Sequence, residues 1–244
     1  TLVAKKEGYY PSRLHVDYIA TDDEAIEETL FSRRWKEPQP VQITLKRVRN
    51  PIPMIAWHAT TSSFKFPTVN GTCSLDVESL EWCPPYGEGK HADITFILSG
   101  IYRERQKDTV PTKVIMKCER PGDGLAFCQS DHWSRFQSAY QVSSDMEFKQ
   151  QQVFEFKPWK SVLPYHTYLV FRVRAELNAE GEIISAHYGK CRGLTQLNPR
   201  GLISFFDVYF NPVPNDTNLE FDTKRNLAPG ETWEQRQRRR VYLP

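Results

Sequence analysis

The stretch TYLVFRVRAELNAEGEIISAHYGKC, Thr167–Cys191, decides the fold class, because it reads as two strands joined by a tight turn. β-branched and aromatic residues fill Thr167–Leu177 and Glu182–Cys191, and such residues suit a pleated, half-buried surface. Between them, Asn178–Gly181 reads as a four-residue hairpin loop, in which Gly181 can take a positive φ. The stretch therefore predicts an antiparallel hairpin of two long strands.

Segments of the same composition recur along the chain, separated by Pro, Gly and Asn turns. Residues Val41–Val48 alternate apolar and polar side chains with the period of two that is typical of a strand. Further strand-like segments are Asp93–Tyr102, Thr112–Glu119, Gln151–Lys157 and Ile203–Phe210. Asn50–Pro53 and Asn211–Asp216 are each expected to end a strand, since Pro removes a ladder donor. Together these segments predict a mainly β fold, an antiparallel β-sandwich of one or two packed β units.

Helix signals are few, and we expect at most one or two short helices. Thr21–Trp35 is the best candidate: Thr21 or Asp22 can cap it, acidic residues fill its first turn, and Arg33 and Arg34 lie near its end. An acidic loop that bulges from a sheet is the alternative for this segment.

Size and composition narrow the class of protein. The chain has 244 residues, of which 39% are hydrophobic and 13% aromatic, so it can build a core without disulfides. Its net charge of +2 argues against nucleic acid as a partner, since a dedicated binder needs a concentrated basic surface. No apolar run approaches the roughly 18 residues of a membrane span, so we expect no transmembrane segment.

The cysteines allow two interpretations. Cys73 with Cys83, and Cys118 with Cys128, form two pairs of equal spacing, which would suit two local disulfides in an oxidising compartment. Alternatively, all of them are buried as small hydrophobic residues. Cys191 is left over in either case.

A search for catalytic and metal-binding patterns finds none of the common motifs. The sequence holds no G-x-S-x-G, no H-E-x-x-H and no phosphate-binding loop. His91 and Asp93 would share a face of a strand, but two ligands are too few for a metal site, so we expect neither a metal nor a cofactor. A spatial pair of catalytic carboxylates would be invisible at this level.

Aromatic residues are the positive signal for binding. They lie at or near expected turns: Trp57, Trp82, Tyr86, Trp133, Trp159 and Tyr165. Such rings either stack on sugars or plug the ends of a sandwich. In the turn-rich stretch Glu81–Gly100, the candidates for ligand binding are Trp82, Tyr86, Lys90, His91 and Asp93.

Several segments resemble known families. Lys5–Arg13, KKEGYYPSR, resembles the last strand of carboxypeptidase-regulatory-like domains, which are transthyretin-like β-sandwiches. Segments along the remaining chain are similar to a group of uncharacterised exported bacterial proteins that are often lipoproteins: Ile43–Met54, Glu81–Phe96, Arg120–Gly124, Phe171–Lys190 and Tyr209–Leu227. The resemblance implies a β fold and export to the periplasm or outer cell surface, but no activity. Cys83 departs from the pattern, where an apolar residue is expected.

The resemblance also implies a division of the chain. Residues 1–50 would form the end of a carboxypeptidase-regulatory-like β unit whose start is missing, with a lipid anchor possible in that missing part. Residues 51–230 would form the main β-sandwich, and 231–244 a basic C-terminal tail.

Two hypotheses for function follow. The first is a non-catalytic exported cell-envelope protein, structural or binding, with another envelope protein or a carbohydrate as its partner. The second is a carbohydrate-binding module or carbohydrate-active enzyme that uses the turn aromatics. The sequence favours a protein without catalytic activity and leaves an enzyme open.

Overall fold

The computed structural model of the chain describes residues 2–14, 43, 45–58, 66–68, 70–103, 108–129, 139–155, 167–192, 197–198, 202–203 and 207–241. Strands account for 50% of the structure and helix for 3%, which confirms the prediction of a mainly β fold. The chain divides into two compact units, Thr1–Val48 and Arg49–Pro244. The helix expected at Thr21–Trp35 lies outside the described residues.

The first unit is built on a short hairpin. Strand β1 (Leu2–Ala4) pairs antiparallel with β2 (Ser12–Leu14), and Tyr9 in the connecting loop bridges to Arg47. Of the strand expected at Val41–Val48, the described residues form this single bridge.

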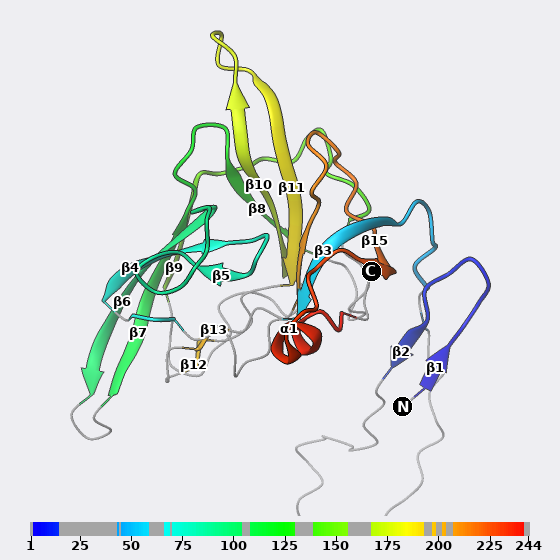
Figure 1. Cartoon of the computed structure of the whole chain (residues 1–244), viewed down its shortest axis with the longest axis horizontal. Helices are drawn as coiled ribbons and strands as arrows, with labels where there is room; N and C mark the ends of the chain where they lie inside the picture. The colour runs from blue at the N-terminus through cyan, green and yellow to red at the C-terminus, as the bar shows by residue number, and fades with distance from the viewer. Residues whose placement is uncertain are drawn as a thin grey trace, which may run out of the picture. The chain divides into compact units, whose positions relative to one another are not determined.

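The second unit is a β-sandwich of two packed sheets (Figure 1). The six-stranded sheet has the order β15 (Phe221–Asn226), β3 (Ile52–His58), β14 (Asp207–Phe210), β11 (Ile183–Arg192), β10 (Thr167–Leu177) and β8 (Gly124–Gln129). The five-stranded sheet has the order β5 (Glu81–Trp82), β4 (Gly71–Asp76), β6 (Ile94–Arg103), β7 (Asp108–Lys117) and β9 (Gln151–Glu155). β15 and β3 are parallel, and all other neighbours in these sheets are antiparallel. Two short strands, β12 (Leu197–Asn198) and β13 (Leu202–Ile203), pair with each other.

The main core lies between the facing sides of the two sheets, where apolar side chains alternate with outward residues. The six-stranded sheet contributes Leu125, Leu169, Phe171, Val173, Val208 and Phe210. The five-stranded sheet contributes Cys73, Leu75, Ile94, Phe96, Leu98, Val114 and Met116. Burial of this apolar area is the main force that holds the sheets together.

The hairpin of β10 and β11 forms as predicted and extends beyond its neighbours in the sheet (Figure 1). In its loop the Asn178 N–H donates to the Glu182 carbonyl at 2.9 Å, and Gly181 takes a φ of 83°. β10 is irregular near its end: the register with β11 shifts after Val173, and Arg174 has a φ of 57°. Such a bulge changes the direction in which a side chain points.

Asn50–Pro53, which we expect to end the preceding strand, also contains the start of the next one, because β3 begins at Ile52 and includes Pro53. The Ile52 N–H donates to the Glu220 carbonyl at 2.8 Å, so the nitrogen of Pro53 faces the opposite edge of β3. On that edge, pairing with β14 starts at Ile55. Pro53 therefore removes no ladder bond, as in an edge position.

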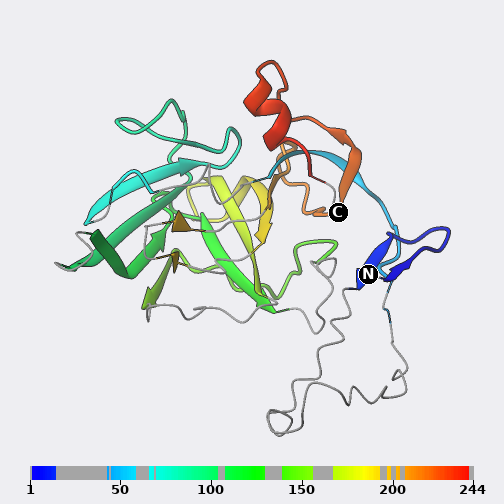
Figure 2. The same ribbon diagram turned by 90° about the horizontal axis from the view of Figure 1, so that it is seen from below.

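The C-terminal segment contains helix α1 (Trp233–Arg238), which lies beside β3 (Figure 2). Thr232 caps it through a reciprocal capping box with Gln235. The Arg238 guanidinium donates to the Leu80 carbonyl at 2.6 Å and stacks 5.3 Å from the Trp57 ring. Within the described residues, the structure contains no helix with the length and apolar character of a membrane span.

Candidate functional site

Strand β5 and the loop between β5 and β6 carry the side chains that the sequence offers as ligand-binding candidates. Tyr86 is 41% exposed, and Lys90 is also exposed. Trp82 and His91 are half-buried, while Asp93 is only 2% exposed. The structure therefore does not bring the five residues together on one exposed surface.

The indole of Trp82 packs on the core rather than standing free as a platform. Its ring centroid lies 5.6 Å from that of Phe66 and 5.8 Å from that of Phe96. The loop beyond it folds back closely: the Gly89 N–H donates to the Trp82 carbonyl at 2.9 Å. A Cβ at Gly89 would lie 2.7 Å from the Glu81 carbonyl oxygen, so only glycine fits there. These contacts support a structural role for Trp82 in closing the sandwich.

Asp76, at the end of β4, holds this loop through its carboxylate. Its Oδ1 accepts the backbone N–H groups of Glu78 and Ser79 at 3.1 and 3.4 Å. Its Oδ2 accepts those of Lys90 and His91 at 2.9 and 3.3 Å. One buried carboxylate therefore satisfies four main-chain donors, two from the turn between β4 and β5 and two from the loop between β5 and β6, as buried polar groups require.

Arg174 of β10 reaches the same loop from the opposite sheet. Its Nε and Nη2 donate to Oδ1 and Oδ2 of Asp93, both at 3.0 Å, and Nη2 also donates to Asp76 at 3.1 Å. Nη1 donates to Glu78, and the guanidinium carbon lies 4.9 Å from the Phe210 ring centroid. We call Asp76, Glu78, Asp93 and Arg174 the Arg174 cluster.

The Arg174 cluster sets three carboxylates against one guanidinium. Burial raises the pKa of Asp93, and the hydrogen bonds and charge of Arg174 oppose that rise. Burial lowers the pKa of Arg174, but its bonds to Asp93 and Glu78 outweigh this and raise the pKa overall. The acids are thus held by a cation that does not titrate, an arrangement that suits cross-linking of the two sheets rather than proton transfer.

Sequence reasoning missed Asp76 and Arg174. Val173 faces the core, so strict alternation would place Arg174 on the outer face of β10. The bulge at Arg174 breaks that alternation, and nothing in the sequence marks the bulge. One signal of this cluster is present in the sequence. Asp93 is an acid at the start of an apolar strand, and a buried acid needs a partner.

Of the two interpretations of the cysteines, the disulfides Cys73–Cys83 and Cys118–Cys128 are not formed, because all five cysteines are free thiols. Cys73 faces the main core, whereas the Cys83 sulfur donates to the His91 carbonyl at 3.4 Å. Cys118 also belongs to the main core, while Cys128 packs on the outer side of β8. The partners in each pair thus point to different surroundings.

His58 and Asp207 form a second polar contact, between β3 and β14. His58 Nδ1 lies 2.7 Å from Asp207 Oδ1, and the two side chains are 37% and 4% exposed. A carboxylate in this position fixes the imidazole orientation. In the part of the chain that the structure describes, no group of three or more His, Cys, Asp or Glu side chains is arranged to hold a metal ion.

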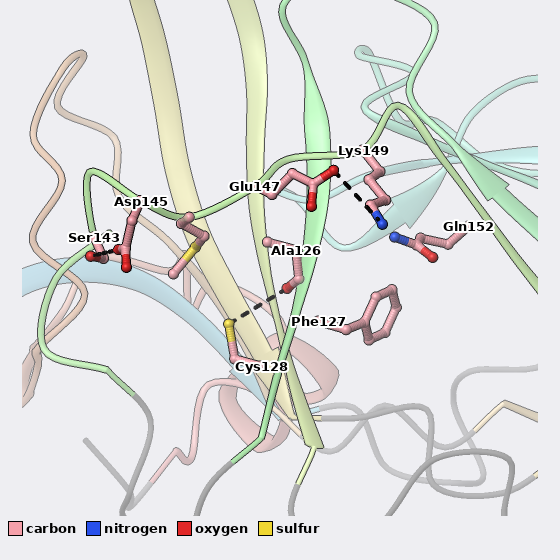
Figure 3. Close-up of a pocket in the computed structure, with 9 residues that line it drawn as sticks. Ala126, Phe127, Cys128, Ser143, Asp145, Glu147, Lys149 and Gln152 are labelled. Carbon is pink, nitrogen blue, oxygen red and sulfur yellow. Dashed lines mark hydrogen bonds and ion pairs between the residues drawn. The ribbon is translucent and has the colours of Figure 1, made fainter.

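A groove of about 460 Å³ lies at the edge of the sandwich, along β8 (Figure 3). This volume falls within the roughly 300–1,000 Å³ that is usual for ligand pockets. It is lined by Ala126, Phe127, Cys128, Ser143, Asp145, Met146, Glu147, Lys149 and Gln152. We call it the β8 groove.

The β8 groove curves around the edge of the strand, since its lining comes from both faces of β8. Phe127 belongs to the side that faces the main core and packs edge-on against Phe154, with 5.1 Å between ring centroids. Ala126 and Cys128 lie on the opposite side (Figure 3). The groove ends where Leu125 bridges to Lys149.

Charged and polar groups line the rim of the β8 groove. Lys149 Nζ lies 3.8 Å from Glu147 Oε1, and Ser143 donates a hydrogen bond to Asp145 that lowers the pKa of this carboxyl (Figure 3). Burial raises the pKa of the Cys128 thiol. This sulfur is therefore neutral at physiological pH, whereas a nucleophilic cysteine needs a lowered pKa.

Comparison with known proteins found no match among protein-family models, curated proteins or solved structures.

Proposed function

We propose that the protein is a non-catalytic binding module of the cell envelope, and that it takes its ligand in the β8 groove. One observation carries this proposal. The groove combines an apolar floor that includes Phe127 and Met146 with polar groups at its rim, such as Asp145 and Lys149. Ligand sites in proteins share this mixture of an apolar surface with a few orienting polar groups.

The state of the buried acids supports a binding role over catalysis. Asp76 and Asp93 are bonded to Arg174 and to main-chain N–H groups, so their oxygens are already occupied. Cys128, the thiol in the groove, has a raised pKa. A catalytic acid, base or nucleophile needs a pKa near the working pH and access to substrate.

Export is the part of this proposal that rests on the sequence resemblance. Fractionation of the native host, with antibody detection, tests it. Recovery in the periplasm or on the outer surface is expected, and recovery in the cytoplasm would overturn this part while leaving the groove unaffected.

Carbohydrate binding at the turn aromatics is the second candidate, and Tyr86 is the observation that favours it. Its ring is 41% exposed between Pro85 and Gly87, and an exposed ring can stack on a sugar. Trp57 and Trp82, by contrast, are committed to packing. This candidate predicts oligosaccharide binding that is lost in Tyr86→Ala and unchanged when the β8 groove is blocked.

The experiment that tests the groove blocks it chemically. A bulky maleimide is attached to Cys128, and Cys128→Ser treated with the same reagent serves as the matched control. Isotope-labelled protein is then titrated with sets of short peptides and of oligosaccharides, while the amide signals of Phe127 and Gln152 are followed by NMR. The proposal expects at least one set to shift these signals in the control and not in the blocked protein. If neither set shifts them, the proposed function is wrong.

A further inference from the structure

The main chain of β8 contributes its own hydrogen-bonding groups to the β8 groove. On the edge away from β10, Leu125 exchanges both hydrogen bonds with Lys149, at 2.9 and 3.0 Å. In an antiparallel ladder, alternate residues direct their N–H and C=O groups to the same edge. The N–H and C=O of Phe127 therefore face the same edge as those of Leu125, toward the groove.

The neighbouring segment departs from this edge just where it would pair with Phe127. Continuing the register from Leu125 and Lys149 would place Glu147 opposite Phe127. The chain instead turns, with the Met146 N–H donating to the Ser143 carbonyl at 3.1 Å. Among the described residues, Phe127 has no hydrogen-bond partner on this edge. The groove occupies the space of the missing strand.

The N–H and C=O that Phe127 directs to this edge are best satisfied by the backbone of another extended chain. This is how peptides add to exposed sheet edges, with main-chain bonds that give affinity and side-chain pockets that give specificity. The walls fit such an occupant, because successive side chains of a strand point to opposite faces. One face would meet Phe127 and Gln152, and the other would meet Cys128 and Met146.

The rim adds a preference for charge. Two carboxylates, Asp145 and Glu147, and one ammonium, Lys149, line the groove, which leaves one negative charge in excess. Lys149 lies within ion-pair distance of Glu147, so Asp145 is the acid that stays available to an incoming cation. Its hydrogen bond from Ser143 fixes its position.

We propose that the occupant of the β8 groove is an extended peptide segment of a partner protein, which adds as a strand to the edge of β8 at Phe127 and places a basic side chain against Asp145. This inference rests on the proposed function and names its ligand class.

The test separates backbone pairing from side-chain contact. A phage library of random dodecapeptides is selected on the immobilised protein, and the strongest sequence is synthesised. Its affinity is measured for Phe127→Pro, which removes the groove-facing N–H but no bond to β10, and for Phe127→Val, which loses the same ring but keeps the N–H. We expect the Pro variant to bind at least about tenfold more weakly than the Val variant.

A second arm covers the case in which Phe127→Pro does not fold, as judged by its melting curve. Peptides that are N-methylated at single positions are measured on the unaltered protein. At alternate positions, methylation is expected to weaken binding about tenfold or more.

In a third arm, exchanging the basic residue of the peptide for norleucine is expected to weaken binding to the unaltered protein but not to Asp145→Asn.

The outcomes are distinct. No enrichment from the library, equal binding by the Pro and Val variants, or indifference to N-methylation would each overturn the peptide inference. If oligosaccharides but not peptides shift the signals of Phe127 and Gln152, the ligand class is wrong and the β8 groove remains a binding site. If neither class does so, the proposed function fails as well.

Discussion

Arg174 and Asp93 meet as a two-bond pair, with 3.0 Å from Nε to Oδ1 and 3.0 Å from Nη2 to Oδ2, across the interior of the sandwich. Arg174 belongs to β10 of one sheet, and Asp93 immediately precedes β6 of the other. Because the Asp93 side chain is almost fully buried, this pair ties the segment Val77–Asp93, which includes β5, to the facing sheet.

Replacing Arg174 with Met should destabilise the protein by about 3–5 kcal/mol, since it leaves buried carboxylates without their cation. Denaturant unfolding measures this change. Arg225→Met is the matched control, because its pair with Asp222 lies at the surface and should cost under about 1 kcal/mol. Equal losses in the two variants would show that the Arg174 cluster does not hold the sheets together.

The free energy of unfolding should depend on pH through the carboxyl group of Asp123. Burial raises the pKa of this carboxyl above its ordinary value of 3.8, although it accepts the Ala175 N–H at 2.7 Å. A raised pKa in the folded state means that its stabilising contribution is complete below pH 3.8 and is lost as pH rises through the folded pKa. The free energy of unfolding, relative to Asp123→Asn, should therefore fall as pH rises through that range. A difference that rises with pH would contradict this.

Thiol titration should distinguish Cys128 from the other cysteines. Cys73, Cys83, Cys118 and Cys191 are buried, and burial raises the pKa of Cys73 and of Cys118 to about 12. With a chromogenic disulfide reagent at mildly alkaline pH, we expect a single reactive thiol in the folded protein, absent in Cys128→Ser. All five should react after denaturation without reductant. A lower total would reveal a disulfide and contradict the free thiols.

Trp82→Ala should lower the melting temperature, because the indole fills space between Phe66 and Phe96. For a half-buried Trp we expect a loss of about 2–3 kcal/mol, or about 5–10 °C in a domain of this size. Tyr86→Ala, at an exposed position of the same loop, should change stability by under about 0.5 kcal/mol. Calorimetry of both variants checks this. An unchanged melting temperature for Trp82→Ala would return Trp82 to the ligand-binding candidates.

Local sequence patterns were enough to predict those strands that depend only on residues close together in the sequence. The hairpin at Thr167–Cys191 forms because its loop needs one residue with positive φ, and Gly181 supplies it. The Ile203–Phe210 segment ends where Asn211 and Pro212 follow, as expected. The inclusion of Pro53 in β3 was not predicted, because a proline interrupts a strand only when its nitrogen faces a pairing partner.

The sites depend on contacts that no local pattern encodes. Arg174 lies 81 residues from Asp93 in the sequence, and its inward direction depends on one bulge. The β8 groove exists because the chain turns at Ser143–Met146 and reaches the edge of β8 only at Lys149, which pairs with Leu125 and leaves the edge at Phe127 open. Of the five candidates offered by the sequence, Asp93 belongs to the Arg174 cluster, while none lines the groove.

The strand order of the six-stranded sheet has a consequence for folding during translation. β3 is the first strand of that sheet to leave the ribosome, yet it lies between β14 and β15, the last two. His58 pairs with Asp207, which is synthesised 149 residues later; at about 5–20 residues per second this takes roughly 7–30 s. During that time Met54, Ala56 and Trp57, all buried in the finished fold, have neither neighbour. The nascent chain therefore carries an apolar strand whose neighbours in the sheet are synthesised only near the end of translation.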